Sequence, residues 1–457
     1  MAPPVLWAGI SCVRFQEYTP KMTTQTPADN AGTSPALKPT APPSATDYDH
    51  PARKEGARAF LVESAVGSTP VSVHGQFTHP FIIKMGATSS HMALLAAMSE
   101  AFSIASQLVA PWLTRATGGR KRMVVVSTLA AAVPWAGLIA VPFLPDGIRV
   151  WAALIMISLT LTVALIGDAP WGSWVSDLVP PGRRGRWMGR RGTIALVVYV
   201  GIGLVGAFTL DGLGEAVKWG FAVAFAAALV ARVASAFIFS RVADPRPDLK
   251  MTPMPPPWKL ATMVKGNPRL GRFYAYMLAI HFAIFFAAPF FGIYMLNDLG
   301  MSYTAYVAAG VVNSLAQMVA MQFWGRVADR KGNYFVLAVC GVTFSLWPIV
   351  FIAVPAIWYV FVANIAMGLA SAGWALCQYN FVLENCSDED RPRSVAFYRI
   401  VVSVGSVTGS LVAAILAPRV PELLTYQIMT MFIISSALRG AATLALLPRF
   451  RGKALAA

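Results

Sequence analysis

Three carboxylic acids interrupt long apolar stretches in the first half of this 457-residue sequence: Glu63, Glu100 and Asp168. Ionisable groups inside a membrane are costly, and they usually face the interior of a helix bundle or a wet cavity. Each of the three could therefore bind a proton or orient a solute. A structural alternative is an ion pair of Asp168 or Glu100 with Arg232, which lies at a depth comparable to that of Asp168 and would hold the bundle together.

The second half supplies mainly neutral polar groups. Asn313 and Gln317 are four residues apart, so they share one helix face and could line a cavity. Asn364 is a further polar group that an interhelical hydrogen bond could satisfy. His281 could titrate near neutral pH, or it could pack and form hydrogen bonds without changing its protonation. Arg439 has no acidic residue at its depth, so it could bind an anionic solute or donate to backbone carbonyls or to Asn364.

Aromatic residues accompany these groups, notably Trp171, Trp174 and Trp374. A cavity lined by aromatic side chains would suit an amphipathic organic molecule better than a bare ion. The alternative is that these rings face lipid or the membrane interface. A glycine pattern, Gly201-Ile-Gly203-Leu-Val-Gly206, spells a dinucleotide-binding motif but lies in an apolar segment without a preceding strand. We interpret it as a site where helices approach closely.

The composition indicates that these groups lie in a membrane. Of all residues, 56% are hydrophobic and only 13% are charged, whereas soluble proteins carry about 25% charged residues. An ordinary cytosolic enzyme is thereby excluded. Apolar segments of about 20–28 residues, each long enough to cross the hydrocarbon core, recur twelve times. They are 57–84, 88–113, 122–144, 149–177, 192–211, 216–241, 271–297, 302–325, 334–353, 357–384, 395–417 and 422–447, and the first is the least apolar.

Basic residues cluster in alternate loops between these segments, while the other loops hold only Lys84, Arg149, Lys218 and Arg419. Because basic loops stay in the cytoplasm, we expect both termini there, in a multi-pass protein of the cell (cytoplasmic) membrane. This clustering also accounts for the net charge of +16 and argues against nucleic acid as a partner.

The expected fold is all-α, with twelve transmembrane helices in two pseudo-symmetric bundles of six. The predicted parts are a disordered cytoplasmic tail (1–56), the first bundle (57–241), a cytoplasmic linker (242–270), the second bundle (271–447) and a cytoplasmic C-terminal tail (448–457).

Three features recur in the two halves at an offset of about 210 residues, which indicates an internal repeat. Arg184-Gly-Arg-Trp-Met-Gly-Arg190 follows the fourth segment, and Arg393-Ser-Val-Ala-Phe-Tyr-Arg399 follows the tenth. Arg232 and Arg439 lie inside the sixth and twelfth segments. Gly325-Arg-Val-Ala-Asp-Arg-Lys-Gly332 follows the eighth, and the loop after the second has a related pattern around Gly118, with Arg115 in place of the aspartate.

The stretch from Gly325 to Gly332 resembles the G-x-x-x-D-R-x-G loop of the major facilitator superfamily, and with the twelve segments the resemblance covers residues 57–447. It implies that two bundles rock about a central site. It also implies that Asp329 and Arg330 belong to a cytoplasmic charge relay that stabilises one conformation, and that Gly325 and Gly332 permit a tight turn. The antiporter subclass is not indicated, because the fifth segment has glycines but no proline.

We expect secondary transport of a small, amphipathic organic solute by alternating access. The sequence has no nucleotide motif, catalytic triad or metal-ligand cluster, so neither an enzyme nor a cofactor is expected. The energy must come from a gradient, and the proton is a candidate coupling ion, with Glu100 and Asp168 as coupling or orienting groups. The other partner is the lipid bilayer, and we expect a monomer. The competing hypothesis is a sensor, or an assembly or delivery factor, with the same fold.

Overall fold

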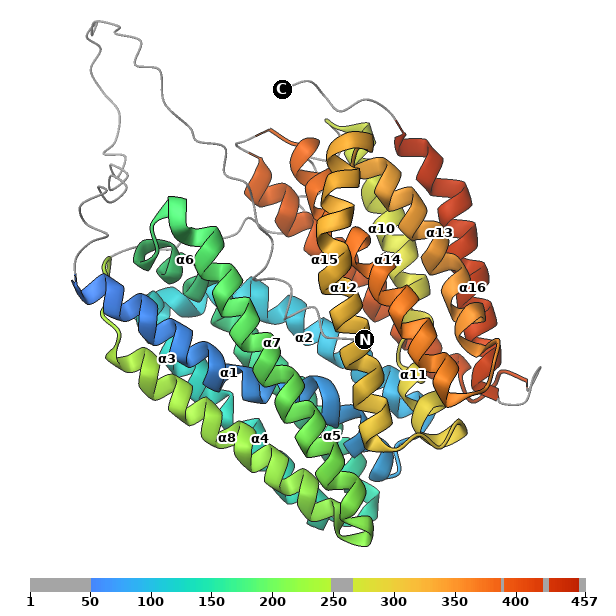
Figure 1. Cartoon of the computed structure of the whole chain (residues 1–457), viewed down its shortest axis with the longest axis horizontal. Helices are drawn as coiled ribbons and strands as arrows, with labels where there is room; N and C mark the ends of the chain where they lie inside the picture. Colours follow the sequence, from blue (N-terminus) through green and yellow to red (C-terminus); the bar gives the residue numbers. More distant parts are fainter. Residues whose placement is uncertain (1–50, 248–265, 388–389, 422–426, 452–457) are drawn as a thin grey trace, which may run out of the picture.

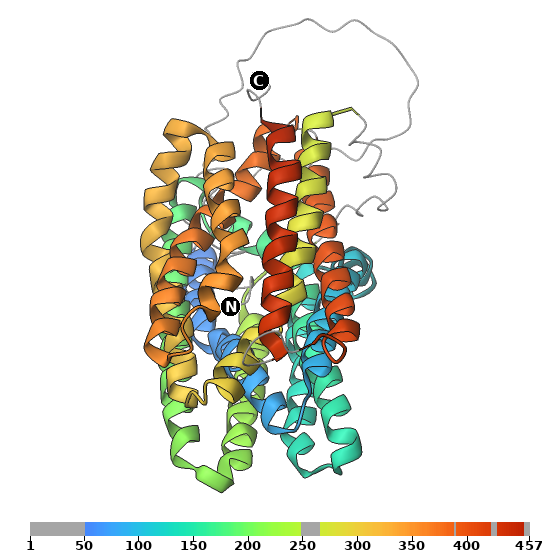
Figure 2. The same cartoon turned by 90° about the vertical axis from the view of Figure 1, so that its right-hand side faces the viewer.

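The structure is a computed structural model that describes residues 51–247, 266–387, 390–421 and 427–451. These residues form helices and turns and contain no strand. Figure 1 shows the first half, coloured blue to green, beside the second half, coloured yellow to red. Figure 2 shows the helices of both halves running in broadly the same direction. The predicted all-α fold in two bundles is confirmed.

Six helical rods make up the first half, and three of them are built from more than one helix. They are α1 (Pro51–Lys84), α2 (Ser89–Ala116), α3 (Arg120–Ala130) continued by α4 (Ala132–Ala140) and η3 (Val141–Phe143), α5 (Asp146–Ile166) continued by α6 (Asp168–Leu178), α7 (Pro181–Gly212), and η4 (Gly214–Ala216) continued by α8 (Val217–Arg241).

The second half repeats this arrangement. Its rods are α10 (Pro268–Ala287) continued by α11 (Phe290–Ile293) and η5 (Tyr294–Asp298), α12 (Tyr303–Lys331), α13 (Asn333–Ile352), α14 (Ile357–Glu384), α15 (Arg391–Leu416), and α16 (Gln427–Leu446) continued by η6 (Leu447–Phe450). Large apolar side chains such as Phe208, Val319 and Leu444 are more than two-thirds exposed, as expected of surfaces that face lipid.

The predicted boundaries need small corrections. Helix α1 begins at Pro51, so the predicted tail of residues 1–56 is helical over its last six positions, and residues 1–50 lie outside the described part. Helix α10 begins at Pro268, inside the predicted linker, because Asn267 caps it by accepting from the Leu270 amide. Residues 248–265 of that linker and residues 452–457 of the C-terminal tail also lie outside the described part.

Helix α1 differs from the other rods because it is polar and yet lies inside its bundle. Eleven rods of the described chain are long and apolar enough to cross a membrane, and α1 is not among them. It packs mainly against α7 and α8. Its polar side chains are buried rather than exposed to lipid: Glu63, Ser64, Ser68, Ser72, Gln76 and Thr78. Interhelical hydrogen bonds engage two of them, since Ser72 Oγ and Gln76 Nε2 both donate to the carbonyl oxygen of Tyr199, each at 2.8 Å.

The glycine pattern in α7 faces this helix. A Cβ at Gly203 would overlap the Gln76 amide, and one at Gly206 would lie 2.7 Å from Phe77 Cζ. The interpretation of this pattern as a site of close helix approach is confirmed.

The two halves meet along two pairs of helices, α2 with α15 and α7 with α12. The ends of the helices that are joined by the arginine-rich loops are called the basic end below, and the other ends are called the opposite end. In Figure 1 the halves converge toward the opposite end, where the start of α12 approaches the last turn of α7.

The contact between α15 and α10 gives a test of the packing. A Cβ at Gly409 of α15 would overlap the carbonyl oxygen of Phe282, which is backbone and cannot rotate away. We expect Gly409→Ala to lower the free energy of unfolding by about 1–3 kcal/mol. Gly440→Ala in α16 is the matched control, because a Cβ there meets nothing within 4 Å. Thermal unfolding in detergent measures both, and equal midpoints for the two variants would contradict the close packing of α15 on α10.

Candidate functional site

Asp168 opens α6 directly after the helix interruption at Gly167, which gives this carboxylate a position inside the rod. The basic end of α6 is at Leu178, so Asp168 lies about 15 Å from that end at 1.5 Å per residue. Its side chain is nevertheless exposed. The charges that act on it are those of Arg191 of α7, Arg232 of α8 and Arg399 of α15. Because Asp168 is exposed while the arginines that act on it belong to both halves, we infer that it faces a water-accessible opening between the halves.

Glu63 of α1 lies next to this group but is buried, with 6% of its surface exposed. Arg191 and Arg232 are the charges that act on it, and Ser235 lies beside it. Gly67 leaves the space that its carboxylate fills. We call Glu63, Asp168, Arg191, Arg232 and Arg399 the charged layer.

Arg232 therefore has two acidic neighbours, and Glu100 is not one of them. The expected ion pair of Asp168 or Glu100 with Arg232 is not formed in the described part of the chain, although the charge of Arg232 acts on both Asp168 and Glu63. Glu100 instead accepts a hydrogen bond of 3.3 Å from Ser403 Oγ. Since Glu100 belongs to α2 and Ser403 to α15, this bond joins the two halves.

Among the aromatic residues, Trp171 borders the charged layer. The guanidinium carbon of Arg191 lies 4.4 Å from the centre of its ring, a favourable cation–π arrangement. Trp174 and Trp374 are buried, with 0% and 5% of their surfaces exposed, so they pack in the protein interior and do not face lipid.

One hydrogen bond joins two of the polar candidates of the second half, and with them the helices α12 and α14. Asn313 Nδ2 donates to the carbonyl oxygen of Asn364 at 3.0 Å. Gln317 is buried. His281 is also buried and donates from Nδ1 to the carbonyl oxygen of Met277 at 2.9 Å.

Arg439 is fully buried and donates to the carbonyl oxygens of Phe344 and Ile284 at 3.0 and 3.3 Å. Of the alternatives considered for Arg439, hydrogen bonding to backbone carbonyls is the one found in the structure.

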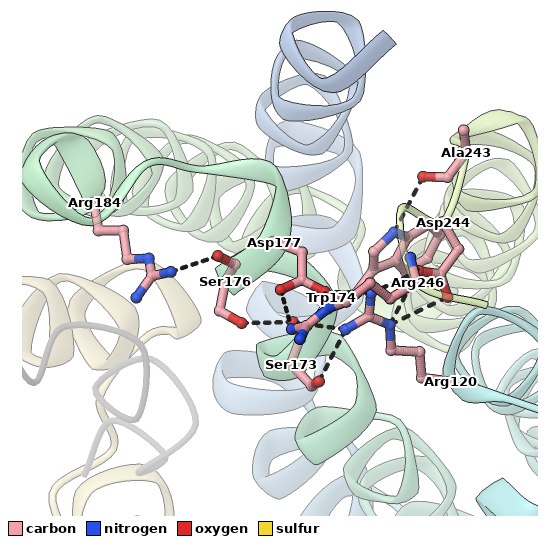
Figure 3. A network of polar contacts seen from close by, with 9 residues as sticks. All are labelled: Arg120, Ser173, Trp174, Ser176, Asp177, Arg184, Ala243, Asp244 and Arg246. Carbon is pink, nitrogen blue, oxygen red and sulfur yellow. Dashed lines mark hydrogen bonds and ion pairs between the residues drawn. The ribbon is translucent and has the colours of Figure 1, made fainter. Parts of the chain in front are cut away.

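A second polar cluster lies at the basic end of the first half (Figure 3). Arg120, at the start of α3, is fully buried and reaches Asp177 of α6 at 2.5 Å and Asp244, beyond α8, at 2.6 Å. Its Nη1 also donates to the Ser173 carbonyl oxygen at 3.0 Å. Arg246 forms a second ion pair with Asp177. This network ties three rods together at their ends.

The loop that carries the predicted relay is arranged differently. Gly332 ends α12 with φ +82°, a conformation that favours glycine. Gly325, by contrast, lies within α12, because this helix continues to Lys331, so the expected role of Gly325 in a turn is wrong. Asp329 and Arg330 are exposed, and no hydrogen bond or ion pair of their side chains is found in the described part of the chain. The second half instead has a bond of 2.5 Å from Asn333 Nδ2 to Glu384 Oε1 at the corresponding place.

A contact at the opposite end crosses between the halves. Asp211, near the end of α7, accepts from the backbone amides of Tyr303 and Thr304, each at 2.8 Å. The first amides of a helix have no partner within the helix, and a carboxylate there is further stabilised by the helix dipole. The first half thus caps α12 of the second half.

Several of these residues were not among the sequence candidates. Arg191 directly precedes the predicted segment 192–211 and Arg399 lies near the start of the predicted segment 395–417, whereas α7 and α15 begin well before them, at Pro181 and Arg391. Asp177 ends an apolar segment just before an arginine-rich loop, which was an available signal. Asp211 carried no signal, because its partners are backbone amides. Among the described residues, no group of three His, Cys, Asp or Glu side chains could hold a metal ion.

The buried network at the basic end gives a prediction. Arg120→Gln would leave Asp177 and Asp244 without their shared partner, and breaking a buried ion pair costs about 3–5 kcal/mol. We expect a correspondingly lower free energy of unfolding. Arg122→Gln removes an exposed arginine of the same helix and should change it by less than about 0.5 kcal/mol. Denaturant unfolding in detergent measures both, and equal effects would argue against the buried network.

Comparison with known proteins identifies the family. The model of the Major Facilitator Superfamily matches residues 76–312 and 276–454. No curated protein matches the sequence. The fold is similar to the crystal structure of the nucleoside transporter NupG, with a TM-score of 0.68 and 10% identity over 87% of this chain and 100% of that chain. It is similar to a bacterial homologue of the human lysosomal transporter Spinster in an inward-facing, occupied conformation, with a TM-score of 0.63 and 13% identity over 89% of this chain and 99% of that chain. It is also similar to a D-xylose–proton symporter, with a TM-score of 0.63 and 14% identity over 88% of this chain and 98% of that chain. With its family model matched over most of its length, the chain belongs to the major facilitator superfamily of membrane transporters.

Proposed function

We propose that this protein transports a small, amphipathic organic solute by alternating access, with the charged layer as part of the solute site. The main observation in support is the position of Asp168, which is exposed inside the molecule among arginines of both halves. The loop charges favour a cell membrane with the basic end on its cytoplasmic side. The opening at Asp168 would then face the cytoplasm. The solute would then be bound or released on the inside in this conformation.

Two carboxylates are suited to couple a gradient to this movement. Asp168 faces Arg399 across the halves, and Glu100 accepts from Ser403 across them. Protonation of either one would change an interaction between the halves, so proton binding and rocking would be linked. Because a ligand can shift an equilibrium only through its different affinity for the two states, such contacts are where coupling should reside.

Asp211 would stabilise the inward-facing state, because it holds the halves together at the opposite end. Its removal leaves the first amides of α12 without acceptors, a loss of about 1 kcal/mol. We expect Asp211→Ala to change the ratio of the two states about fivefold, toward the outward-facing state. Distances between spin labels at exposed positions 186 and 326 of the basic end report the change.

The matched control is Asp146→Ala, since Asp146 is 87% exposed and pairs with Arg149 of its own helix. An unchanged distance distribution in Asp211→Ala would show that the cap does not hold the inward-facing state.

The proposal of coupled transport is tested in proteoliposomes that contain a pH-sensitive dye and are challenged with pools of small organic solutes. We expect solute-dependent proton movement that is lost in Asp168→Asn or Glu100→Gln. Glu215→Gln, which changes an exposed carboxylate outside the charged layer, should transport like the wild type. Labelled-solute uptake in the same vesicles separates coupled from uncoupled transport.

The outcomes distinguish the candidate functions. Uptake without proton movement would support transport but exclude the proton as the coupling ion. If the folded protein shows neither solute uptake nor proton movement with any pool, the result would contradict transport and favour a sensor or an assembly factor. Full activity of both carboxylate variants would remove Asp168 and Glu100 from the mechanism.

A further inference from the structure

The charged layer contains more positive than negative charge. The charges that act on Asp168 are three arginines, and those that act on Glu63 are two of the same three. Arginine remains protonated in proteins. Even when both carboxylates are ionised, the layer therefore keeps one positive charge in a setting where unpaired charge is costly. A bound anion would balance it.

Two of the three guanidinium groups are available to such an anion. In the described part of the chain, Arg232 and Arg399 form no hydrogen bond or ion pair, and Asp168 forms none either. The Nε atoms of Arg191 and Arg232 are buried without a hydrogen-bond partner. Arg399 is exposed, so it can be reached from the same opening as Asp168.

The neighbouring side chains favour an organic anion over an inorganic one. The ring of Trp171 is half-buried beside the layer, with Arg191 stacked on it. A planar guanidinium matches a carboxylate or a phosphate with two parallel hydrogen bonds, and an aromatic ring gives apolar area to the rest of the molecule.

We infer that the solute is an organic anion whose carboxylate or phosphate group is bound between Arg232 of the first half and Arg399 of the second. This inference rests on the proposed transport function and specifies its substrate class. An anion held by both halves would draw them together at the level of the charged layer. Binding and movement would then be linked by one contact that exists only when the site is occupied.

The test uses probes that share a ring and differ in charge: benzoate, phenyl phosphate, benzamide and benzylamine. Purified full-length protein in detergent is heated with each probe, because a ligand that binds the folded state raises the unfolding temperature. We expect at least one of the two anions to raise it, and benzamide and benzylamine to leave it unchanged. The dissociation constant of the effective anion follows from its concentration dependence.

The arginine variants assign the site. Arg399→Gln removes a charge-assisted pair and should weaken anion binding about tenfold or more. Arg399→Lys keeps the charge without the planar fork and should retain part of the affinity. Arg393→Gln is the matched control, since Arg393 lies in the same helix with its side chain 59% exposed, and it should bind like the wild type.

Three results would overturn the inference: stabilisation by benzylamine but by neither anion, wild-type anion affinity in Arg399→Gln, or no stabilisation by either anion or by a wider pool of carboxylates and phosphates. Uptake assays with the same charge classes separate this from the proposed function. Transport of neutral or cationic solutes alone would support the proposed transport function but exclude an organic anion as the solute. Transport of no class would contradict both.

Discussion

The free-energy cost of placing a charge in hydrocarbon determines where the ionisable side chains of this transporter lie. Glu63, Arg191 and Arg232 are gathered in one layer, where each acts on a charge of opposite sign. Arg439, which has no acidic neighbour among the described residues, donates to backbone carbonyls of two helices. Arg120 is withdrawn completely into a network with two aspartates. In each case the solution is an internal partner, and this requirement holds the helices at particular depths and rotations.

The same cost explains why the least apolar rod lies inside its bundle. The serines and the glutamine of α1 would be unsatisfied against lipid, whereas α7 offers the Tyr199 carbonyl and glycines that admit side chains closely. Helix α1 contributes Glu63 to the charged layer, while the surrounding rods present apolar side chains to the bilayer.

The helices could be predicted from sequence because hydrocarbon thickness dictates their length, and the alternation of basic loops supports α1 where hydropathy alone does not. The internal structure of the rods could not. Arg191 and Arg399 follow arginine-rich loops, and only the early starts of α7 and α15 place them in the charged layer. The partners of Arg439 and Asp211 are backbone groups, which every residue carries, so no spacing of side chains indicates them. The acidic neighbours of Arg232, Glu63 and Asp168, depend on the rotation of α8 about its axis, which the sequence leaves undetermined because this segment is apolar on all sides.

The asymmetry between the halves follows from these placements. The first half supplies two carboxylates and two arginines of the charged layer, and the second supplies only Arg399. The ion-pair network likewise stabilises the basic end of the first half, where the second half has the bond between Asn333 and Glu384. A first half braced in this way can move as a unit, so rocking need change only the packing of α2 on α15 and of α7 on α12 and the polar interactions that cross between the halves. The polar interactions that cross between the halves include the hydrogen bonds of Asp211 at one end and of Glu100 at mid-depth, and the charge of Arg399 acts on Asp168 across them. All of them could change without any need to rearrange either bundle.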